Sequence, residues 1–191
     1  MIAAVVLAAG RGERFGGDKV LAPLRGQPVV RHVVERLHAA GLSPVIVVGG
    51  AGVAALRAAL AETPAQVVEH PAWAEGLSSS LRAGIAAVPE ECPAFVVALG
   101  DQPLVDVAVI RALVDTWRGC NAAAVVPKYA DGRGNPVLFD ATMRRRLAEL
   151  RGDTGARSLL EAMGDRAVRL PVASPAPRDV DTPDDLRALE G

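Results

Sequence analysis

A glycine-rich loop with three cationic side chains follows the first apolar run of the chain. The run, Ile2–Leu7, is typical of a buried strand, and the loop continues from it to Lys19. Small residues let a backbone approach a polyphosphate and point N–H groups at it, while Arg11, Arg14 and Lys19 supply positive charge. The sequence therefore predicts a phosphate site here. The residues expected to form it are Leu7, Ala8, Ala9, Gly10, Arg11, Gly12 and Lys19.

This loop differs from two common phosphate-binding patterns. No Gly-Lys-Ser or Gly-Lys-Thr sequence closes it, as it would in a P-loop. It is also longer and more basic than the glycine fingerprint of dinucleotide-binding proteins. The loop therefore indicates neither a P-loop kinase nor a dehydrogenase.

A carboxylate follows another apolar run, Ala94–Leu99. Asp101 stands just after this run, and Pro103 restricts the turn. An aspartate at this position often caps a turn or a helix. Magnesium, however, is bound through one or two carboxylates together with substrate phosphates, and a phosphate loop is predicted nearby. Asp101 is therefore a candidate metal ligand.

A second acidic cluster lies near the end of the chain, from Asp179 to Asp185. Thr182 as N-cap, Pro183 at the first helical position and Asp185 three residues after the cap predict the start of a helix. This explanation does not need Asp179 or Asp181, which precede the cap. These two carboxylates remain available for another role.

Three consecutive serines occupy the first turn of a predicted helix within Glu75–Gly84. Ser78, Ser79 and Ser80 could cap that helix or contact a ligand, and the sequence favours neither role for any single serine. The segment does not match Gly-x-Ser-x-Gly, so a nucleophile elbow is not indicated.

The elements that must position these residues alternate between strands and helices. Apolar stripes at three- and four-residue spacing predict helices around Val29–Leu37 and Val109–Trp117, and further helices are expected at about Ala141–Leu150 and Ala156–Met163. In the third of these, Arg144, Arg145 and Arg146 are interpreted as a solvated face. The expected strands are Ile2–Leu7, Pro44–Val48, Gln66–Glu69, Ala94–Leu99 and Ala122–Val126, with a short apolar piece at Pro136–Phe139.

This alternation predicts an α/β fold with an open, doubly wound, Rossmann-like and mostly parallel sheet. Ligands of such sheets lie beyond the carboxyl ends of the strands, where the phosphate loop and Asp101 stand. We expect one domain over residues 1–191, with a nucleotide-binding half at 1–126 and an acceptor-binding half at 127–191.

Composition limits the classes of partner. A net charge of −1 and an aromatic content of 3% argue against a nucleic-acid partner. The N-terminal apolar run is too short to span a bilayer, so no membrane partner is expected. Cys92 and Cys120 lack the spacing of a zinc or redox site and are typical of a reducing compartment. These features predict a cytoplasmic protein.

Taken in order, the motifs resemble the MobA-like nucleotidyltransferase family, which includes molybdenum cofactor cytidylyltransferase and guanylyltransferase. The likeness runs from Ile2 to Leu186. It implies a fold of the nucleotide-diphospho-sugar transferase type, with the first loop around a triphosphate and Glu75–Gly84 closing over base and ribose. It also implies that Asp181 is the second metal-binding aspartate, and that Gly134–Phe139 and Gly152–Arg157 shape the acceptor site.

The activity implied by this resemblance is Mg²⁺-dependent transfer of CMP from CTP to the terminal phosphate of molybdopterin cofactor, with release of pyrophosphate. Leu7-Ala8-Ala9-Gly10 resembles the cytidylyl-transferring branch, in which CTP is used. A molybdoenzyme or its chaperone is the implied protein partner. The implied catalytic residues are Arg11, Lys19 and Asp101, the metal ligands Asp101 and Asp181, and the further nucleotide contacts Ser78, Ser79, Ser80 and Gly100.

Three alternatives remain open from the sequence. The first is a related transferase that uses GTP, or an acceptor that is a sugar phosphate or an isoprenoid-pathway phosphate. Relatives often carry His where Asn135 stands and a basic residue where Thr154 stands, which leaves the acceptor open. The second is an NAD-dependent oxidoreductase, because Gly50, Gly52 and Ala55 fit a relaxed dinucleotide fingerprint, although Gly49–Gly52 is better interpreted as a tight turn. The third is a non-catalytic nucleotide-binding protein on the same scaffold.

Overall fold

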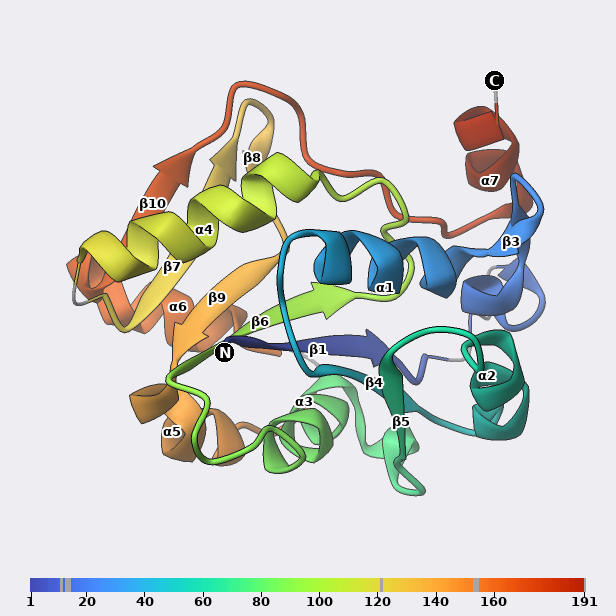
Figure 1. Ribbon diagram of the computed structural model, residues 1–191, viewed down its shortest axis with the longest axis horizontal. Helices are drawn as coiled ribbons and strands as arrows, with labels where there is room; N and C mark the ends of the chain where they lie inside the picture. The colour runs from blue at the N-terminus through green and yellow to red at the C-terminus, as the bar shows by residue number, and fades with distance from the viewer. Residues whose placement is uncertain (11, 13–14, 121, 153–154, 191) are drawn as a thin grey trace.

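A mixed β-sheet with helices on both faces forms the core of the computed structural model, which describes residues 1–10, 12, 15–120, 122–152 and 155–190 (Figure 1). Within these residues the sheet has eight strands, in the order β10-β7-β9-β6-β1-β4-β5, with β8 paired to β7. The strands are β1 (Ala3–Ala8), β4 (Val45–Gly49), β5 (Ala65–Glu69), β6 (Ala94–Leu99), β7 (Ala124–Tyr129), β8 (Gly132–Arg133), β9 (Val137–Asp140) and β10 (Ala167–Pro171). A separate hairpin joins β2 (Pro23–Leu24) to β3 (Gln27–Pro28).

The helices divide between the two faces of the sheet (Figure 1). One apolar layer contains residues of α1 and α4, and the other contains residues of α3, α5 and α6. The α-helices are α1 (Val29–Ala39), α2 (Val53–Ala59), α3 (Leu77–Ala86), α4 (Val107–Gly119), α5 (Arg144–Ala148), α6 (Arg157–Met163) and α7 (Pro183–Glu190). Short 3-10 turns occupy Lys19–Leu21, Trp73–Glu75, Ala141–Met143 and Gly164–Arg166.

The predicted fold class is confirmed. Strands β4, β1 and β6 run parallel, and their residues are buried almost throughout because helices cover both faces. Helices α1 and α4 form where the apolar stripes predict them, with Val33 and Leu37 buried in α1 and Ile110 and Leu113 in α4. The sheet combines strands from both predicted halves of the chain.

The far side of the sheet contains β9, which the sequence indicates only as a short apolar piece, and β10, which it does not reveal. Strand β9 lies antiparallel between β6 and β7, and the edge strand β10 pairs in parallel with β7. Strand β10 has one face exposed, which carries Arg169, so it lacks the continuous apolar run that marks a central strand. The predicted helix at Ala141–Leu150 is shorter and consists of a 3-10 turn followed by α5.

Helix α3 packs unusually close to the centre of the sheet because of Gly84. A Cβ atom at this position would overlap Val5 of β1 and lie 2.9 Å from a methyl group of Val48 in β4. The close approach places the first turn of α3 beside the carboxyl ends of these strands. This is the edge where the sequence predicts a ligand.

The interpretation of the three arginines at 144–146 as a solvated face is wrong for Arg144. Its guanidinium donates hydrogen bonds to the carbonyl oxygens of Val88, Pro89 and Cys92 at 2.7, 2.6 and 3.2 Å. We expect Arg144→Ala to lower the free energy of unfolding by about 2 kcal/mol, because it leaves these carbonyls without their charged donor. The exposed neighbour provides a control, and Arg145→Ala should change this energy by less than about 0.5 kcal/mol in urea unfolding. Equal effects of the two substitutions would contradict this role.

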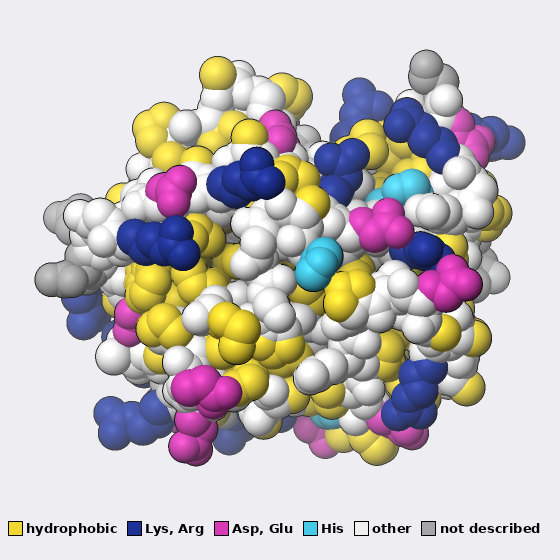
Figure 2. All heavy atoms as spheres, viewed as in Figure 1, with side chains coloured by type: hydrophobic (Ala, Val, Ile, Leu, Met, Phe, Trp, Pro, Cys, Tyr) yellow, Lys and Arg dark blue, Asp and Glu magenta, His cyan; other side chains and the backbone are white. Residues whose placement is uncertain are grey.

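Charges of both signs are mixed over the face of the molecule shown in Figure 2. This distribution agrees with the net charge of −1. Among the helices that the structure describes, none combines the length and apolar character required to cross a membrane.

Candidate active site

The carboxyl ends of β1 and β6 meet at one edge of the sheet. The N–H of Gly100 donates a hydrogen bond to the carbonyl of Leu7 at 2.9 Å, which ties the loop after β6 to the end of β1. A Cβ atom at Gly100 would lie 3.0 Å from the Cβ of Ala8, so glycine permits this approach. Asp101 therefore lies beside the start of the predicted phosphate loop.

The loop after β1 turns back on itself at Gly12. This residue has φ +59°, and a Cβ atom there would overlap the carbonyl oxygen of Gly17. Hydrogen bonds from Phe15 to Gly12 at 2.8 Å and from Lys19 to Gly17 at 2.9 Å hold the turn. The turn returns Lys19 to the carboxyl end of the sheet, where a 3-10 turn begins.

Lys19 joins the two aspartates that the sequence singled out. Its Nζ lies 2.5 Å from Oδ2 of Asp101 and 2.8 Å from Oδ1 of Asp181. The three side chains are only 15%, 17% and 31% exposed, so this is a partly desolvated cluster and not a surface ion pair. Two carboxylates 80 positions apart in the chain thus converge on one cation.

The segment before α7 holds Asp181 in place through the backbone. The N–H of Val180 donates to the carbonyl of Asp101 at 2.9 Å, and the buried Val180 side chain packs with Leu24 and Leu189. This packing also brings α7 beside β2 and β3, as Figure 1 shows. Gln102 adds a hydrogen bond from its Nε2 to Oδ1 of Asp179 at 2.7 Å.

The predicted helix start at Thr182 is confirmed. The N–H and the hydroxyl of Thr182 both donate to Oδ2 of Asp185 at 2.7 Å, and the N–H of Asp185 donates back to the threonine hydroxyl at 3.2 Å. This reciprocal arrangement is a capping box with aspartate in place of glutamate. It fixes the direction in which the chain leaves Asp181.

Two pKa shifts describe the charge balance of this cluster. Burial alone would lower the pKa of Lys19, but its hydrogen bonds to Asp101 and Asp181 and their negative charges outweigh burial and raise it. Partial burial of the carboxyl raises the pKa of Asp179. The charges of Asp101 and Asp181 raise this pKa further, against the opposing effects of the Gln102 hydrogen bond and the Lys19 charge. Lys19 therefore stays cationic at neutral pH, with both carboxylates as its partners.

A cavity of about 750 Å³ opens beside this cluster, large enough for a nucleotide. It lies between the loop after β1, the first turn of α3 and the end of β6. The residues that line it are Leu7, Ala8, Ala9, Gly10, Gly12, Lys19, Val20, Trp73, Ala74, Gly76, Leu77, Ser80, Leu99, Asp101 and Asp181.

Most of the predicted site residues that the structure describes line this cavity, but three do not. Ser79 is buried and its hydroxyl donates to the Gly76 carbonyl at 2.7 Å while it contacts His70 at 2.9 Å. Ser78 is also buried and lies outside the cavity lining, and Gly100 acts through its backbone. Arg11 and Thr154 lie outside the described residues.

Two large side chains of the cavity wall are not among the individual site residues predicted from the sequence, although one of them lies within the predicted segment Glu75–Gly84. Trp73 and Leu77 both belong to the segment after β5, and Leu77 is 39% exposed. The signal that could have identified them is their place in the sequence, shortly after an expected strand and therefore at the edge where ligands bind. They give one side of the cavity an apolar surface.

The glycine turn after β4 lacks room for a dinucleotide. A Cβ atom at Gly50 would lie 2.8 Å from the carbonyl of Ala9, and one at Gly52 would lie 2.6 Å from the carboxylate of Asp18. The adjacent hollow has a volume of only about 60 Å³. Neighbouring backbone and a carboxylate thus fill the place that a pyrophosphate would need, which favours the interpretation of Gly49–Gly52 as a tight turn.

The donor set of this cluster suits a divalent cation that also binds a substrate. The described residues contain no group of three or more His, Cys, Asp or Glu side chains that could hold a metal alone. Asp101 and Asp181, however, direct carboxylate oxygens at one cation, and hard oxygen ligands are those that Mg²⁺ prefers. Phosphate oxygens of a bound nucleotide would complete such a coordination shell.

Comparison with known proteins identifies a family and relatives. The model of the MobA-like NTP transferase domain matches residues 4–168. Nicotine blue oxidoreductase from Paenarthrobacter nicotinovorans is 34% identical over 166 residues, which cover 83% of this chain and 81% of that protein. The bifunctional protein GlmU of Sphingopyxis alaskensis is 35% identical over 127 residues, but these cover only 28% of its length.

Solved structures resemble this chain over nearly its whole length. Rv0371c from Mycobacterium tuberculosis has a TM-score of 0.85 and 37% identity, with 98% of this chain and 96% of that chain covered. A manganese complex of the same protein has a TM-score of 0.82 and 36% identity at the same coverage. A nucleotidyl transferase from Methanothermobacter has a TM-score of 0.80 and 28% identity, with 100% of this chain and 96% of that chain covered.

Proposed function

Because the chain belongs to the family of MobA-like NTP transferase domains, we propose that it transfers a nucleotidyl group from a nucleoside triphosphate to a phosphorylated acceptor. The observation that carries this proposal is the convergence of Lys19, Asp101 and Asp181 beside a glycine-rich loop and a cavity of nucleotide size. These groups match the charges of a triphosphate and of a divalent cation.

The reaction requires positioning and charge more than a covalent nucleophile. An oxygen of the acceptor phosphate attacks the α-phosphorus in line, the bond from the α-phosphorus to the bridging oxygen breaks, and pyrophosphate leaves. The loop from Ala8 to Gly12 would bind the triphosphate through its backbone, with Arg11 adding charge. Lys19 would exchange a carboxylate partner for phosphate oxygens and neutralise the departing pyrophosphate.

Asp101 and Asp181 would hold a divalent cation, which we take to be Mg²⁺, against the α-phosphate. The manganese complex of Rv0371c supports the use of a divalent metal by a relative. When bound, such an ion withdraws electron density from the phosphoryl oxygens and stabilises developing charge. In the free protein Lys19 neutralises the same two carboxylates, so the ammonium and the metal compete for them.

The nucleotide of this proposal is CTP and the acceptor is molybdopterin cofactor, with a molybdoenzyme or its chaperone as the recipient of the product. The resemblance of Leu7-Ala8-Ala9-Gly10 to the cytidylyl-transferring branch supports CTP. The test is pyrophosphate release with each of the four nucleoside triphosphates, with and without Mg²⁺ and molybdopterin cofactor. We expect release only with CTP, metal and acceptor together. Binding of nucleotide without release would indicate a binding protein, and release with GTP would correct the nucleotide.

The turn at Gly12 supplies a test of the phosphate loop. Gly12→Ala places a side chain at φ +59° against the Gly17 carbonyl, so the loop must open. Strain of about 1–3 kcal/mol should weaken CTP binding roughly tenfold in calorimetry, with the thermal midpoint as a check on folding. Gly17→Ala is the control, because a Cβ there meets nothing within 4 Å. Equal CTP affinity of the two variants would show that the loop does not bind phosphates.

A second candidate function comes from the relative named nicotine blue oxidoreductase. Its name favours an oxidoreductase, and the apolar wall formed by Trp73 and Leu77 is compatible with an apolar organic substrate. The filled turn at Gly50 and Gly52 argues against nicotinamide binding by the dinucleotide fingerprint. Oxidation of NADH in the presence of an organic dye, without any need for divalent metal, would favour this candidate over the transferase.

A further inference from the structure

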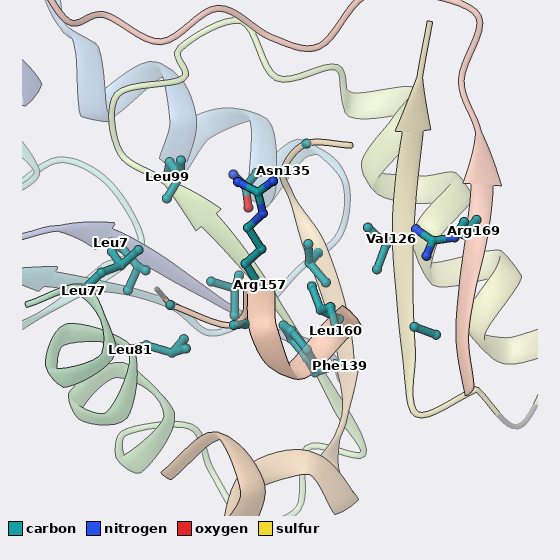
Figure 3. A pocket seen from close by; sticks show the side chains of 16 residues that line it. Leu7, Leu77, Leu81, Leu99, Val126, Asn135, Phe139, Arg157, Leu160 and Arg169 are labelled. Atoms are coloured by element: carbon teal, nitrogen blue, oxygen red, sulfur yellow. The ribbon is translucent and has the colours of Figure 1, made fainter. Parts of the chain in front are cut away.

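The segment from His70 to Ser79, called here the wall segment, connects β5 to the first turn of α3 and forms one wall of the nucleotide cavity. Its residues that line the cavity are Trp73, Ala74, Gly76 and Leu77. Figure 3 shows Leu77 at the start of α3 and Leu7 near the end of β1, and both also line a neighbouring pocket of about 410 Å³. That pocket contains residues of Gly134–Phe139 and Gly152–Arg157, the segments that the resemblance assigns to the acceptor.

Side chains at the two ends of the wall segment are hydrogen-bonded to each other. Nε2 of His70 lies 2.9 Å from the hydroxyl oxygen of Ser79. That oxygen also lies 2.7 Å from the carbonyl oxygen of Gly76 and 3.3 Å from that of Ala72. A hydroxyl has one proton to donate, and a carbonyl oxygen can only accept. The Ser79 hydroxyl therefore donates to Gly76, and Nε2 of His70 carries the proton that it donates to Ser79.

This direction of donation excludes a nucleophilic role for Ser79. A serine nucleophile gives its proton to the neighbouring imidazole, whereas here the imidazole donates to the serine. Ser79 is also only 2% exposed and does not line the nucleotide cavity. Nε2 can donate from the neutral ring and from the charged ring, so titration of the imidazole does not remove the bond. The contact is thus suited to fixing the shape of the chain.

The backbone around His70 anchors the first end of the wall segment to the sheet. The N–H of His70 donates to the carbonyl of Gly49 at the end of β4 at 2.9 Å, and the His70 carbonyl accepts from the N–H of Trp73 at 3.2 Å. A Cβ atom at Gly50 would lie 2.8 Å from the ring of Trp73, so this ring packs over the turn after β4. The bond from His70 to Ser79 therefore ties an anchored end to α3 and closes the wall segment into a ring.

We propose that His70 is a positioning residue for nucleotide binding, because its hydrogen bond to Ser79 holds the wall segment in the shape that lines the nucleotide cavity. This inference rests on the proposed transferase function and adds a residue to its nucleotide site. His70 does not line the cavity, so it acts through Trp73 and Leu77. Loss of the bond weakens nucleotide binding, whereas the chemical step depends on the charged cluster on the other side of the cavity and is unchanged.

The dependence of turnover on CTP concentration tests this role. His70→Leu removes the donor, and we expect the KM for CTP to rise about tenfold while turnover at saturating CTP stays within about twofold. His70→Gln should restore the KM, because the amide nitrogen of glutamine can take the place of Nε2 and donate to Ser79. Calorimetry with CTP should show the same order of affinities. His38→Leu, on the exposed side of α1, is the control and should change neither quantity.

Two results would overturn the role of His70. One is a normal KM for His70→Leu in a folded protein. The other is an equally raised KM for His70→Leu and His70→Gln, because a role that depends on the donor requires glutamine to rescue. A hundredfold loss of turnover at saturating CTP would likewise contradict it, since His70 would then affect the chemical step.

Trp73 reports the shape of the wall segment without any nucleotide. The chain has two tryptophans, so Trp117→Phe leaves Trp73 as the single indole emitter. In this background His70→Leu should shift the emission to longer wavelength and increase quenching by acrylamide, because a loosened wall segment exposes the ring to water. His70→Gln should do neither. Unchanged emission and quenching in His70→Leu would contradict the proposed effect on the wall segment.

Ser79→Ala breaks the same bond from its other end and serves as the second variant if His70→Leu does not fold. We expect the KM for CTP to rise about tenfold here as well. The double variant His70→Leu with Ser79→Ala should show no further rise, because the two substitutions remove one shared interaction. Multiplying effects would show that the two residues act independently, against the proposal.

The outcomes also separate this inference from the proposed function. CTP binding with the expected order of variants, but no pyrophosphate release with any acceptor, would refute the transferase and retain His70 as a positioning residue of a nucleotide site. Pyrophosphate release with the same KM in every variant would retain the transferase and overturn the role of His70.

Discussion

Asp101→Asn is expected to lower the rate of pyrophosphate release by about a hundredfold or more, with the fold retained. The substitution keeps the shape of the side chain but removes the negative charge that lies 2.5 Å from the Lys19 ammonium. A metal held between Asp101 and Asp181 would lose one of its two protein carboxylates. Steady-state turnover at saturating CTP and Mg²⁺ measures this loss, because saturating concentrations fill the site even if the affinity has fallen.

Asp179→Asn is the matched control for this prediction. It removes the same charge from the same cluster of loops, yet Asp179 does not line the nucleotide cavity, and its partner Gln102 can donate equally to an asparagine oxygen. We expect turnover within a few-fold of the unmodified protein. A normal rate for Asp101→Asn, or an equal loss for both variants, would show that Asp101 has no specific role.

Lys19→Met is expected to reduce turnover by about a hundredfold and to change how the protein responds to metal alone. Without the ammonium, Asp101 and Asp181 face each other as two like charges, so the variant should unfold at a lower temperature. A divalent cation can then occupy the position that Lys19 fills in the unmodified protein. Mg²⁺ or Mn²⁺ without nucleotide should therefore raise the unfolding midpoint of the variant more than that of the unmodified protein.

The chain's other lysine supplies the control for this charge removal. Lys128 is exposed on β7 and lies outside the nucleotide cavity, so Lys128→Met should leave both turnover and the response to metal unchanged. If metal raised the unfolding midpoint equally in the unmodified protein, Lys19→Met and Lys128→Met, Lys19 and the cation would not share the two carboxylates.

The parts of the fold that follow from local pattern could be predicted from the sequence. The run Ala94–Leu99 forms β6 with the predicted bounds, because a strand covered on both faces must be apolar throughout. Thr182 and Asp185 identify the start of α7, because the hydrogen bonds of a capping box join residues only three positions apart. By contrast, β10 has an exposed face that carries Arg169, so its sequence lacks a strand pattern. It is a strand because it pairs with β7, and this pairing could not be predicted from the sequence.

Much of the candidate site depends on contacts between distant segments, which sequence pattern does not encode. Asp101 and Asp181 could be paired only through a family resemblance, since the hydrogen bond from Val180 to Asp101 exists only in the folded chain. The role of Lys19 between two carboxylates was not foreseen, because the sequence shows its charge but not its partners. Ser79 was predicted to contact the nucleotide, but its hydroxyl is engaged by His70 and Gly76. These partners also could not be identified from the sequence.

The most direct test of the central claim is the position of a divalent ion bound together with nucleotide. In crystals grown with Mn²⁺ and a non-hydrolysable CTP analogue, the anomalous signal of manganese should lie between Asp101 and Asp181 at coordination distance from both, with the triphosphate along the loop from Ala8 to Gly12. Lys19 should then contact phosphate oxygens. A manganese peak away from these two carboxylates, or a triphosphate bound beside the Gly50–Gly52 turn, would contradict the account.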